Sequence, residues 1–248
     1  MSDKIYLSVI APAYNERDNI EQFVREVYSV CAGLGKPFEI IVVDDGSTDD
    51  QLEVLAPVFE EITELRVVCF AKNTGQSAGV AAGIKAARGE IIAMVDSDLQ
   101  NDPASIPDML GYIERGECDM VNGWRKERND PPVKLLSTRI ANGVRNALTH
   151  ESIHDSACGL KVFRAQCVRD IRFFTGLHRF IPTLVKLEGY RVKEVPVRHR
   201  PRVAGESKYG VGNRAFRALR DTFAIRWMQS RYFKYEATEW SRDESNIQ

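Results

Sequence analysis

The order of apolar and polar segments in the N-terminal half constrains the fold most strongly. Apolar runs occur at residues 7–11, 40–43, 65–70 and 91–95. Between the first two runs, apolar residues of the segment from Asp18 to Val30 recur every three or four positions, which is the period of a helix. Strands that alternate with helices in this way form parallel sheets. We therefore expect an α/β protein with a mostly parallel, doubly wound central sheet and helices on both faces.

Polar segments follow three of the four runs at the point where each run ends. They read Tyr14-Asn15-Glu16, Asp44-Asp45-Gly46-Ser47 and Asp96-Ser97-Asp98. The carboxyl ends of parallel strands lie along one edge of a sheet, and ligands of open α/β sheets bind in the crevice at that edge. The sequence therefore predicts an acidic cleft assembled from three separate segments.

The second of these segments has a structural explanation as well as a functional one. Asp-Gly is a turn signal, and we expect helix capping to explain Ser47, Thr48 or Asp49. Capping does not explain why a buried strand ends in two adjacent carboxylates, Asp44 and Asp45. One of them could accept a hydrogen bond from the base or ribose of a nucleotide.

Asp96 and Asp98 are the strongest candidates for a metal site. In an extended chain alternate residues point to one side, so Asp96, Asp98 and Gln100 would present two carboxylates and an amide oxygen together. Mg²⁺ takes such oxygen ligands, usually one or two carboxylates with substrate phosphates and water. A D-x-D pair also arises by chance, and a solvated helix cap is the alternative. The position beside two other acidic strand ends favours the metal site.

A glycine-rich segment suggests a phosphate-binding loop, but its spacing does not fit one. Asn73-Thr74-Gly75 is followed by Gly79 and Gly83, without the G-x-x-x-x-G-K-[ST] or G-x-G-x-x-G pattern. We expect these small residues, four positions apart, to let a helix approach the sheet closely.

The segment H-E-S-I-H, His150 to His154, has the letters of a zinc protease motif. That chemistry needs both histidines on one helix face and a third ligand. The helix is expected to end here, and the following residues do not have the extended metzincin spacing. We expect structural or hydrogen-bonding histidines instead, and the same for His178 and His199.

The second half of the chain continues without a linker or repeat, so we expect a single domain. The pattern predicts helices at 103–115 and 133–148 and strands at 119–124, 159–163 and 190–197. The Val195-Pro196 pair predicts an edge or terminal position for the last strand, because proline cannot donate to a sheet ladder.

Basic residues gather in this second half, although 34 Lys and Arg nearly balance 35 Asp and Glu over the chain. The balance gives no reason to expect a nucleic-acid partner. A solvated basic face is the usual explanation for any one of these residues. Together, near an acidic cleft, they suggest ligands that carry phosphate. They are Arg125, Lys126, Arg128, Lys134, Arg139, Arg145, Arg198, Arg200, Arg202 and Lys208.

Cysteine usage and hydropathy bear on the compartment. The five cysteines are scattered and form no C-x-x-C pair, so we expect reduced, buried thiols in the cytoplasm. The apolar run at residues 5–13 is too short for a signal peptide, and no run reaches the roughly 18 apolar residues that span a bilayer. We expect any work at a membrane to be done from its surface.

The segment from Asn213 to Tyr232 has the composition of an interfacial amphipathic helix. Phe216, Leu219, Phe223 and Trp227 recur at three and four positions, with arginines between them. A helix that docks on its own domain or on a second subunit is the alternative.

Seven segments together carry a resemblance to a known family. They read SVIAPAYNE, IIVVDDGSTD, MVDSDLQNDP, GWRKER, DSACGLKVFR, HRFIP and HRPRVAGESKYG. They resemble the family 2 inverting glycosyltransferases of the GT-A fold, in particular the polyprenyl-phosphate sugar synthases, which include dolichol-phosphate mannose synthase and bacterial undecaprenyl-phosphate glycosyltransferases. The resemblance runs from about Leu7 to Gly212, and the R-x-x-G-x-S-K stretch is its most specific part.

The resemblance implies roles for individual residues. It implies a nucleotide-sugar pocket of Pro12, Tyr14, Glu16, Val43, Asp45, Asp96 and Ser97. It implies a Mg²⁺ or Mn²⁺ and diphosphate site of Asp96, Asp98 and Gln100. It implies a clamp for the phosphates of a UDP- or GDP-sugar donor and a lipid acceptor, formed by Arg125, Arg139, Arg202 and Lys208.

The resemblance also implies an organisation and a reaction. We expect a GT-A domain at residues 1–212, divided into a nucleotide-sugar half (1–102) and an acceptor half (103–212), then an amphipathic helix and polar tail at 213–248. Members often end in transmembrane helices; here we expect peripheral contact at the cytoplasmic face of a membrane, and a homo-oligomer is possible.

Polyprenyl phosphate is the expected acceptor, because a phosphate dianion needs no general base. Two alternatives stay open. One is transfer to a sugar or protein hydroxyl with Asp155 as the base. The other is a non-catalytic subunit that binds nucleotide sugar.

Overall fold

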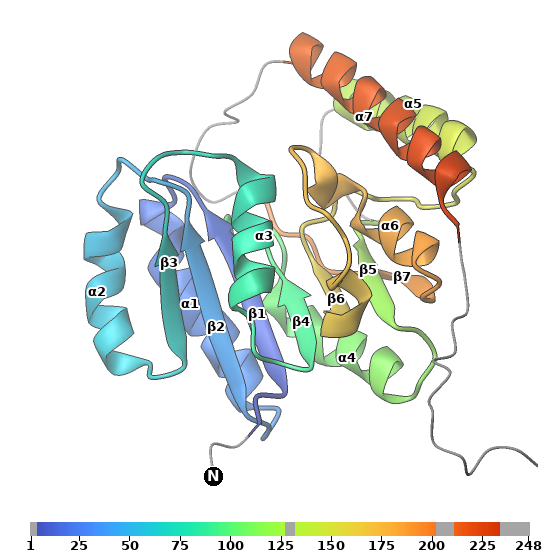
Figure 1. The fold of residues 1–248 in the computed structure, drawn as a ribbon. Coiled ribbons are helices and arrows are strands. Elements are labelled where there is room, and N and C mark those ends of the chain that lie inside the picture. The colour runs from blue at the N-terminus through green and yellow to red at the C-terminus, as the bar shows by residue number, and fades with distance from the viewer. Residues whose placement is uncertain (1–3, 127–131, 202–210, 234–248) are drawn as a thin grey trace, which may run out of the picture.

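Seven strands pair into one central sheet in the computed structural model, which describes residues 4–126, 132–201 and 211–233 (Figure 1). The order across the sheet is β3-β2-β1-β4-β6-β5-β7, and β6 runs antiparallel to both of its neighbours. The other pairs are parallel, which confirms the expected mostly parallel sheet. The strands are β1 (Leu7–Ala13), β2 (Phe38–Asp44), β3 (Leu65–Cys69), β4 (Ile91–Met94), β5 (Met120–Trp124), β6 (Lys161–Arg164) and β7 (Val192–Pro196).

Helices cover both faces of this sheet, as expected for an α/β fold. In Figure 1, α3 lies across one face and α1 lies behind the strands, while α5 and α7 lie side by side at one end. The helices are α1 (Arg17–Ala32), α2 (Gln51–Glu61), α3 (Gln76–Ala86), α4 (Ile106–Glu114), α5 (Pro132–Thr149), α6 (Ile181–Leu187) and α7 (Val211–Arg231). The described part of the chain also forms short 3₁₀ turns at Pro103–Ser105, Ala165–Val168 and Leu177–Arg179.

The core consists of two layers, because successive residues of a buried strand point to opposite faces. In β2, Ile40 and Val42 pack with the α1 and α4 layer, whereas Ile41 and Val43 pack with the α3 and α6 layer. All seven residues of β2 are buried, as expected for a strand covered on both sides.

Helix α3 approaches the sheet closely at two glycines. A Cβ atom at Gly79 would lie 2.9 Å from Pro12 Cβ, and one at Gly83 would lie 3.0 Å from Ile10 Cβ. The prediction that small residues let a helix lie close to the sheet is therefore confirmed at these two positions. The consequence is that α3 is set tightly against β1.

Strand β7 lies at one edge of the sheet, as the Val195-Pro196 pair predicted. The reversed direction of β6 could not be read from its own sequence. It places the start of β6 beside the end of β4, since Lys161 pairs with Met94. The turn before β6 therefore reaches the edge at which the predicted cleft lies.

The structure also shows the state of the cysteines and the apolar character of the helices. All five cysteines lie in the described residues and are free thiols; four are buried, but Cys69 is exposed, so the prediction of a buried residue was wrong there. Within the described ranges, none of the helices combines the length and apolar character that a bilayer crossing needs.

A buried carboxylate lies where β1 and β2 begin, at the end of these strands opposite to the predicted cleft. Glu39 Oε1 accepts from Ser8 Oγ at 2.7 Å and from the Arg88 backbone N–H at 2.7 Å. Glu39 Oε2 pairs with Arg66 Nη1 at 2.6 Å. Glu39 is only 3% exposed, so its partners would be left unsatisfied without it.

We therefore expect Glu39→Ala to lower the free energy of unfolding by about 2–4 kcal/mol, because it leaves buried donors without an acceptor and breaks a partly buried ion pair. Urea denaturation would measure the change, with Glu60→Ala at an exposed site of α2 as the control. If the unfolding free energies of the Glu39 and Glu60 variants differ by less than about 0.5 kcal/mol, the contacts of Glu39 do not stabilise this part of the sheet.

Candidate active site

The loops after β1 and β2 are hydrogen-bonded to each other. Asn15 N donates to Ser47 Oγ at 2.9 Å, and Thr48 N donates to Asn15 Oδ1 at 2.8 Å. Asp49 accepts from the backbone N–H groups of Arg17 and, at 3.3 Å, of Gln51 at the start of α2. The N-cap residue of α2 is Asp50, so none of the three residues expected to cap the helix is its N-cap: Asp49 accepts from the first helical residue, and Ser47 and Thr48 join the two loops. These bonds fix the first two polar segments relative to each other.

Asp45 holds the segment that leads into α3. Its carboxylate accepts from Thr74 N at 2.7 Å, from Gly75 N at 2.8 Å and from Asn73 Nδ2 at 3.1 Å. Its neighbour Asp44 accepts from Gln51 Nε2 at 2.6 Å. Both carboxylates at the end of β2 therefore have structural partners, and contact of Asp45 with a nucleotide stays a prediction.

The remaining predicted nucleotide-pocket residues lie along the same edge. Pro12 and Val43 are opposite each other on β1 and β2, and Ser97 Oγ donates to the Pro12 carbonyl at 3.1 Å. Tyr14 and Glu16 follow β1, where Glu16 Oε2 accepts from Asn19 Nδ2 at 2.8 Å. The predicted pocket residues are thus gathered at one edge of the sheet, as the topology argument required.

Asp96 lies at the centre of this edge, just beyond the end of β4. Its Oδ1 accepts from Gln76 Nε2 at 2.8 Å. Its Oδ2 packs against Gly159, where any Cβ atom would overlap with the carboxylate. Burial raises the pKa of Asp96 to about 6, and the Asp98 carboxylate adds to this, while Lys161 and Arg125 act in the opposite direction.

The chain does not stay extended through Gln100, so this part of the sequence prediction was wrong. Strand β4 ends at Met94, residues 97–99 form a bend, and Leu99 has a φ of 58°. Asp98 Oδ1 accepts the backbone N–H of Gln100 at 3.2 Å within this bend. Alternation along a strand therefore does not place Gln100 with the two carboxylates, and its role as a metal ligand stays a prediction without that support.

The donor set suits a hard divalent cation that arrives with phosphates. Among the residues that the structure describes, no three His, Cys, Asp or Glu side chains form a ready metal cage. Mg²⁺ is commonly held by one or two carboxylates together with substrate phosphates and water. The pKa of Asp96 is raised because burial and the nearby Asp98 carboxylate disfavour its negative charge. A bound cation would offset both effects.

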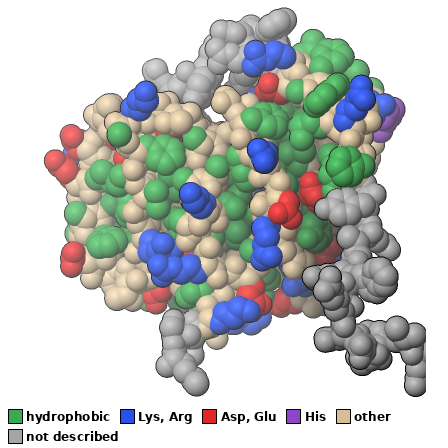
Figure 2. Space-filling model, in the orientation of Figure 1, with side chains coloured by type: hydrophobic (Ala, Val, Ile, Leu, Met, Phe, Trp, Pro, Cys, Tyr) green, Lys and Arg blue, Asp and Glu red, His purple; other side chains and the backbone are tan. Residues whose placement is uncertain are grey.

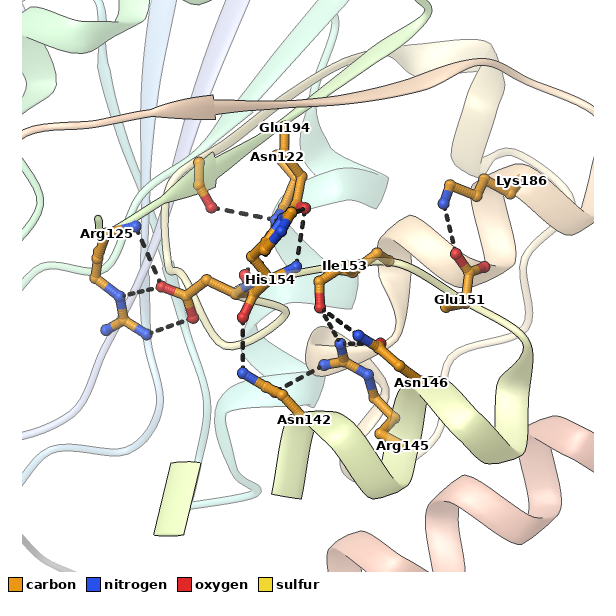
Figure 3. A network of polar contacts seen from close by, with 12 residues as sticks. Asn122, Arg125, Asn142, Arg145, Asn146, Glu151, Ile153, His154, Lys186 and Glu194 are labelled. Carbon is orange, nitrogen blue, oxygen red and sulfur yellow. Dashed lines mark hydrogen bonds and ion pairs between the residues drawn. The ribbon is translucent and has the colours of Figure 1, made fainter. Parts of the chain in front are cut away.

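Arg125 directly follows β5 and is labelled in Figure 3; it forms a largely buried pair with Asp155, with side chains 13% and 4% exposed. Its Nε donates to Asp155 Oδ2 at 2.7 Å and its Nη2 to Oδ1 at 2.9 Å. Burial acts to lower the pKa of Arg125, but the bonds and charge of Asp155, with smaller effects of Cys158 and Asp96, raise it above its ordinary value. The arginine is therefore a fixed cation close to the acidic edge.

The same pairing bears on Asp155 as a general base. Asp155 is 3% exposed, and both carboxylate oxygens accept from Arg125. A base must have an oxygen within reach of the substrate hydroxyl. The arrangement suits a positioning carboxylate better than a general base.

Glu194 of β7 holds the backbone next to Asp155 (Figure 3). It accepts from the backbone N–H of His154 at 2.9 Å, from His154 Nδ1 at 2.9 Å and from Asp155 N at 3.2 Å. The His154 ring also stacks on Trp124. The prediction of a hydrogen-bonding histidine is confirmed, and His150 follows the end of α5 with a φ of 54°, so the two histidines do not share a helix face.

Two arginines that were candidate phosphate ligands form hydrogen bonds or ion pairs with other groups of the protein. Arg145 is buried and donates to the Ile153 carbonyl at 2.8 Å. Arg200 pairs with Glu26 at 2.6 Å and with Asp102 at 2.8 Å. Their positive charge is used to join segments of the fold.

The backbone of Arg200 also fixes the approach to the basic segment that follows. Its N–H donates to the Gln100 carbonyl at 2.8 Å, and His199 forms a β-bridge with Asn101. Arg202 and Lys208 lie outside the described residues, and of Arg139 only the backbone, within α5, is described. Residues 199 and 200 therefore lie beside the loop that carries Asp98.

Comparison with known proteins identifies the family. The model of Glycosyl transferase family 2 matches residues 8–172. A dodecaprenyl-phosphate galacturonate synthase of Rhizobium johnstonii is 37% identical over 235 residues, which are 93% of this chain and 68% of the relative. An undecaprenyl-phosphate 4-deoxy-4-formamido-L-arabinose transferase of Edwardsiella ictaluri is 32% identical, covering 83% of this chain and 63% of the relative. This chain belongs to glycosyl transferase family 2, and it spans about two thirds of the length of these relatives.

Solved structures confirm the GT-A-type fold. Glucosyl-3-phosphoglycerate synthase from Mycobacterium tuberculosis, crystallised with Mn²⁺, UDP and glucosyl-3-phosphoglycerate, aligns with a TM-score of 0.67 at 18% identity, covering 91% of this chain and 80% of that one. A mannosyltransferase from Pyrobaculum calidifontis, crystallised with GDP-mannose and Mn²⁺, aligns with a TM-score of 0.64 at 19% identity, covering 95% and 67%. The fold that the sequence predicted is thus shared with glycosyltransferases of different donors.

Two residues of the site were missed at the sequence level. Gln76 contacts Asp96, which lies twenty positions later in the sequence, and no local motif predicts such a contact. Gly159 lies in the segment DSACGLKVFR, which contributed to the family resemblance, but only the geometry shows that its missing side chain makes room for Asp96.

We expect Gly159→Ala to lower kcat/KM by about 10- to 100-fold, because a displaced carboxylate no longer has productive geometry. The new Cβ would also lie 2.8 Å from Asn101 Nδ2, but both neighbours are ends of side chains that can rotate, so the fold should persist. Transfer assays and thermal unfolding would measure both effects. Gly143→Ala in α5 is the matched control, since a Cβ there meets nothing within 4 Å. Unchanged activity of the Gly159 variant would show that this contact does not position Asp96.

Proposed function

We propose that this chain is a metal-dependent inverting glycosyltransferase that moves a sugar from a UDP- or GDP-sugar to a polyprenyl phosphate. The observation that carries the proposal is the juxtaposition of the acidic Asp96 and Asp98 turn with the buried Arg125–Asp155 pair. The identity of 37% to a dodecaprenyl-phosphate galacturonate synthase supports the choice of acceptor.

The chemistry of a phosphate acceptor fits the arrangement of Asp155. A phosphomonoester has a second pKa near 6 and is largely dianionic at neutral pH, so it can attack without a general base. Its need is positive charge that offsets repulsion from the donor diphosphate. Asp155 takes two of the five guanidinium donors of Arg125 and fixes the orientation of the plane, so the others can contact a phosphate.

In this proposal the residues divide the work as follows. Pro12, Tyr14, Glu16, Val43, Asp45 and Ser97 hold the nucleotide, and Asp96, Asp98 and Gln100 hold a Mg²⁺ or Mn²⁺ ion. That ion would stabilise negative charge on the departing nucleoside diphosphate. Arg125, Arg139, Arg202 and Lys208 bind the phosphates and bring the acceptor oxygen in line with the anomeric carbon, which gives inversion.

The test is transfer of label into a lipid. Purified protein is incubated with labelled UDP- and GDP-sugars, with and without polyprenyl phosphate and Mn²⁺, and label is counted in the organic phase. We expect metal-dependent extraction, and a loss of at least about 100-fold in Asp98→Asn with unchanged thermal stability.

The same assay separates the alternative acceptors. A water-soluble product that disappears in Asp155→Asn would support transfer to a hydroxyl and contradict the lipid proposal. Nucleotide-sugar binding without any transfer would point to a non-catalytic subunit. In the lipid proposal Asp155→Asn weakens the positioning of Arg125, and transfer is reduced but still reaches the lipid.

We propose further that α7 contacts the membrane surface from the cytoplasmic side. Leu219, Phe223 and Trp227 follow one another at four-residue spacing and are 41%, 55% and 64% exposed, while Ile225 on the other face is buried. Figure 2 shows hydrophobic side chains mixed with basic ones over the end of the molecule where α5 and α7 lie. Phe216 belongs to the same helix, but its side chain lies outside the described residues.

The neighbouring side chains fit an anionic bilayer. Ile140 and Val144 of α5 are also exposed, which widens the apolar surface. Arg220, Arg226 and Arg231 lie on the same helix as the exposed aromatic residues. Apolar residues with adjacent arginines are typical of helices that lie in the lipid headgroup region.

We expect the double variant Phe223→Glu, Trp227→Glu to reduce flotation with phosphatidylglycerol vesicles by at least about tenfold, because charges replace the residues that enter the interface. Phe59→Glu is the control, since Phe59 is 47% exposed on α2, a helix on another part of the surface. Equal flotation of the double variant and wild type, or no flotation of wild type, would contradict membrane contact through α7.

A further inference from the structure

The side-chain amide of Gln76 reaches the carboxylate of Asp96 from a different part of the chain. Gln76 is the first residue of α3, and its Nε2 donates to Asp96 Oδ1 at 2.8 Å. Its side chain is exposed, so it contributes little to the core. Gln76 therefore acts on the partly buried carboxylate of Asp96 through this hydrogen bond and not through packing.

The backbone on the N-terminal side of Gln76 is fixed by Asp45. The N–H groups of Thr74 and Gly75 donate to this carboxylate at 2.7 and 2.8 Å. Gly75, the residue before the helix, has a φ of 101°, a conformation that favours glycine. The path of the chain into Gln76 is therefore set by the end of β2.

The C-terminal side of Gln76 is fixed by a turn from the second half of the chain. Ser77 Oγ accepts the backbone N–H of Gly176 at 2.9 Å and lies 2.8 Å from His178 Nδ1. With anchors on both sides, the start of α3 cannot shift along the sheet. The Gln76 amide is thus held at a defined distance from β4.

Asp96 is restrained on its other oxygen as well. Its Oδ2 lies against Gly159, which has no side chain to displace it. The carboxylate plane is therefore defined from two directions, by a hydrogen bond on one oxygen and by a packing surface on the other. Removing the hydrogen bond would leave the Gly159 contact as the remaining one of these two restraints on rotation about χ1 and χ2.

We propose that Gln76 is a positioning residue that orients Asp96 toward the cation and diphosphate of the donor. The inference rests on the proposed function, because it assumes that Asp96 binds the metal. Carboxylates that ligate metals are themselves hydrogen-bonded, and loss of such a partner typically weakens metal binding by about 10- to 100-fold. Gln76 supplies such a hydrogen bond to Asp96.

The test measures Mn²⁺ binding directly as well as turnover. Wild type, Gln76→Ala and Gln22→Ala are titrated with Mn²⁺ in the presence of UDP, and separately of GDP, while the free-ion signal is followed by electron paramagnetic resonance. Gln22 is the matched control, since its Nε2 donates to Glu26 Oε1 at 2.8 Å on the surface of α1. Thermal unfolding and the Mn²⁺ dependence of sugar transfer are measured on the same samples.

We expect Gln76→Ala to raise the half-saturating Mn²⁺ concentration about tenfold. The value of kcat at saturating Mn²⁺ should change less than about threefold, because excess ion restores the bound geometry. The melting temperature should match that of Gln22→Ala. This separation of metal affinity from kcat and stability is expected of a positioning residue and not of a residue needed only for folding.

Two results would overturn the inference. One is a half-saturating Mn²⁺ concentration in Gln76→Ala within about twofold of wild type. The other is a fall in melting temperature well beyond that of Gln22→Ala, since the residue would then act through folding. If wild type binds no Mn²⁺ with either nucleotide, the proposed metal site itself fails; wild-type binding with an unaffected variant refutes only the role of Gln76.

Discussion

Carboxylates that are buried at the end of β2 or partly buried just after β4 must be hydrogen-bonded or matched by positive charge, since taking them out of water without partners is costly. Asp45 meets this requirement with N–H groups from residues 73–75, and Asp96 meets it with the Gln76 amide. Both sets of donors come from the segment that leads into α3. That segment therefore fixes the two acidic strand ends relative to each other, and the close packing of α3 at Gly79 and Gly83 keeps it in place.

Much of the fold could be predicted because its determinants are local. Segments were predicted at all seven strands that the described residues form, four of them from apolar runs, and proline at position 196 predicted the edge position of the last strand. Strand β6 was expected at nearly the right residues, but its direction depends on which neighbours it pairs with. Pairing between β4 and β6 joins residues about seventy positions apart, and no periodicity within either strand records it.

The candidate site was predictable in its location but not in its internal partners. Strand topology brought Asp45 and Asp96 to one edge, as expected. The fate of each arginine could not be read from charge patterns, because a pattern does not say which carboxylate lies opposite in space. Arg125 pairs with Asp155, and Arg200 pairs with Glu26 and Asp102, whereas all were equally plausible phosphate ligands by composition.

Local backbone geometry set a further limit to prediction. The expectation that Gln100 continues an alternating row failed because β4 ends at Met94 and Leu99 adopts a positive φ. Asp98 stabilises this bend by accepting the Gln100 N–H, a bond that competes with extended structure. A short polar side chain just after a strand can therefore either bind a ligand or stabilise a turn, and the sequence does not distinguish between these two roles.

The reversed direction of β6 has a consequence for how α5 is connected to the sheet. Because β6 starts where β4 and β5 end, the turn that carries Asp155 and Gly159 reaches the acidic edge from a strand that is only beginning. The chain leaves this edge after Arg125 and returns to it at Asp155, with α5 between the two. Because Arg125 and Asp155 pair with each other, α5 is attached to the sheet at two points that an ion pair holds together.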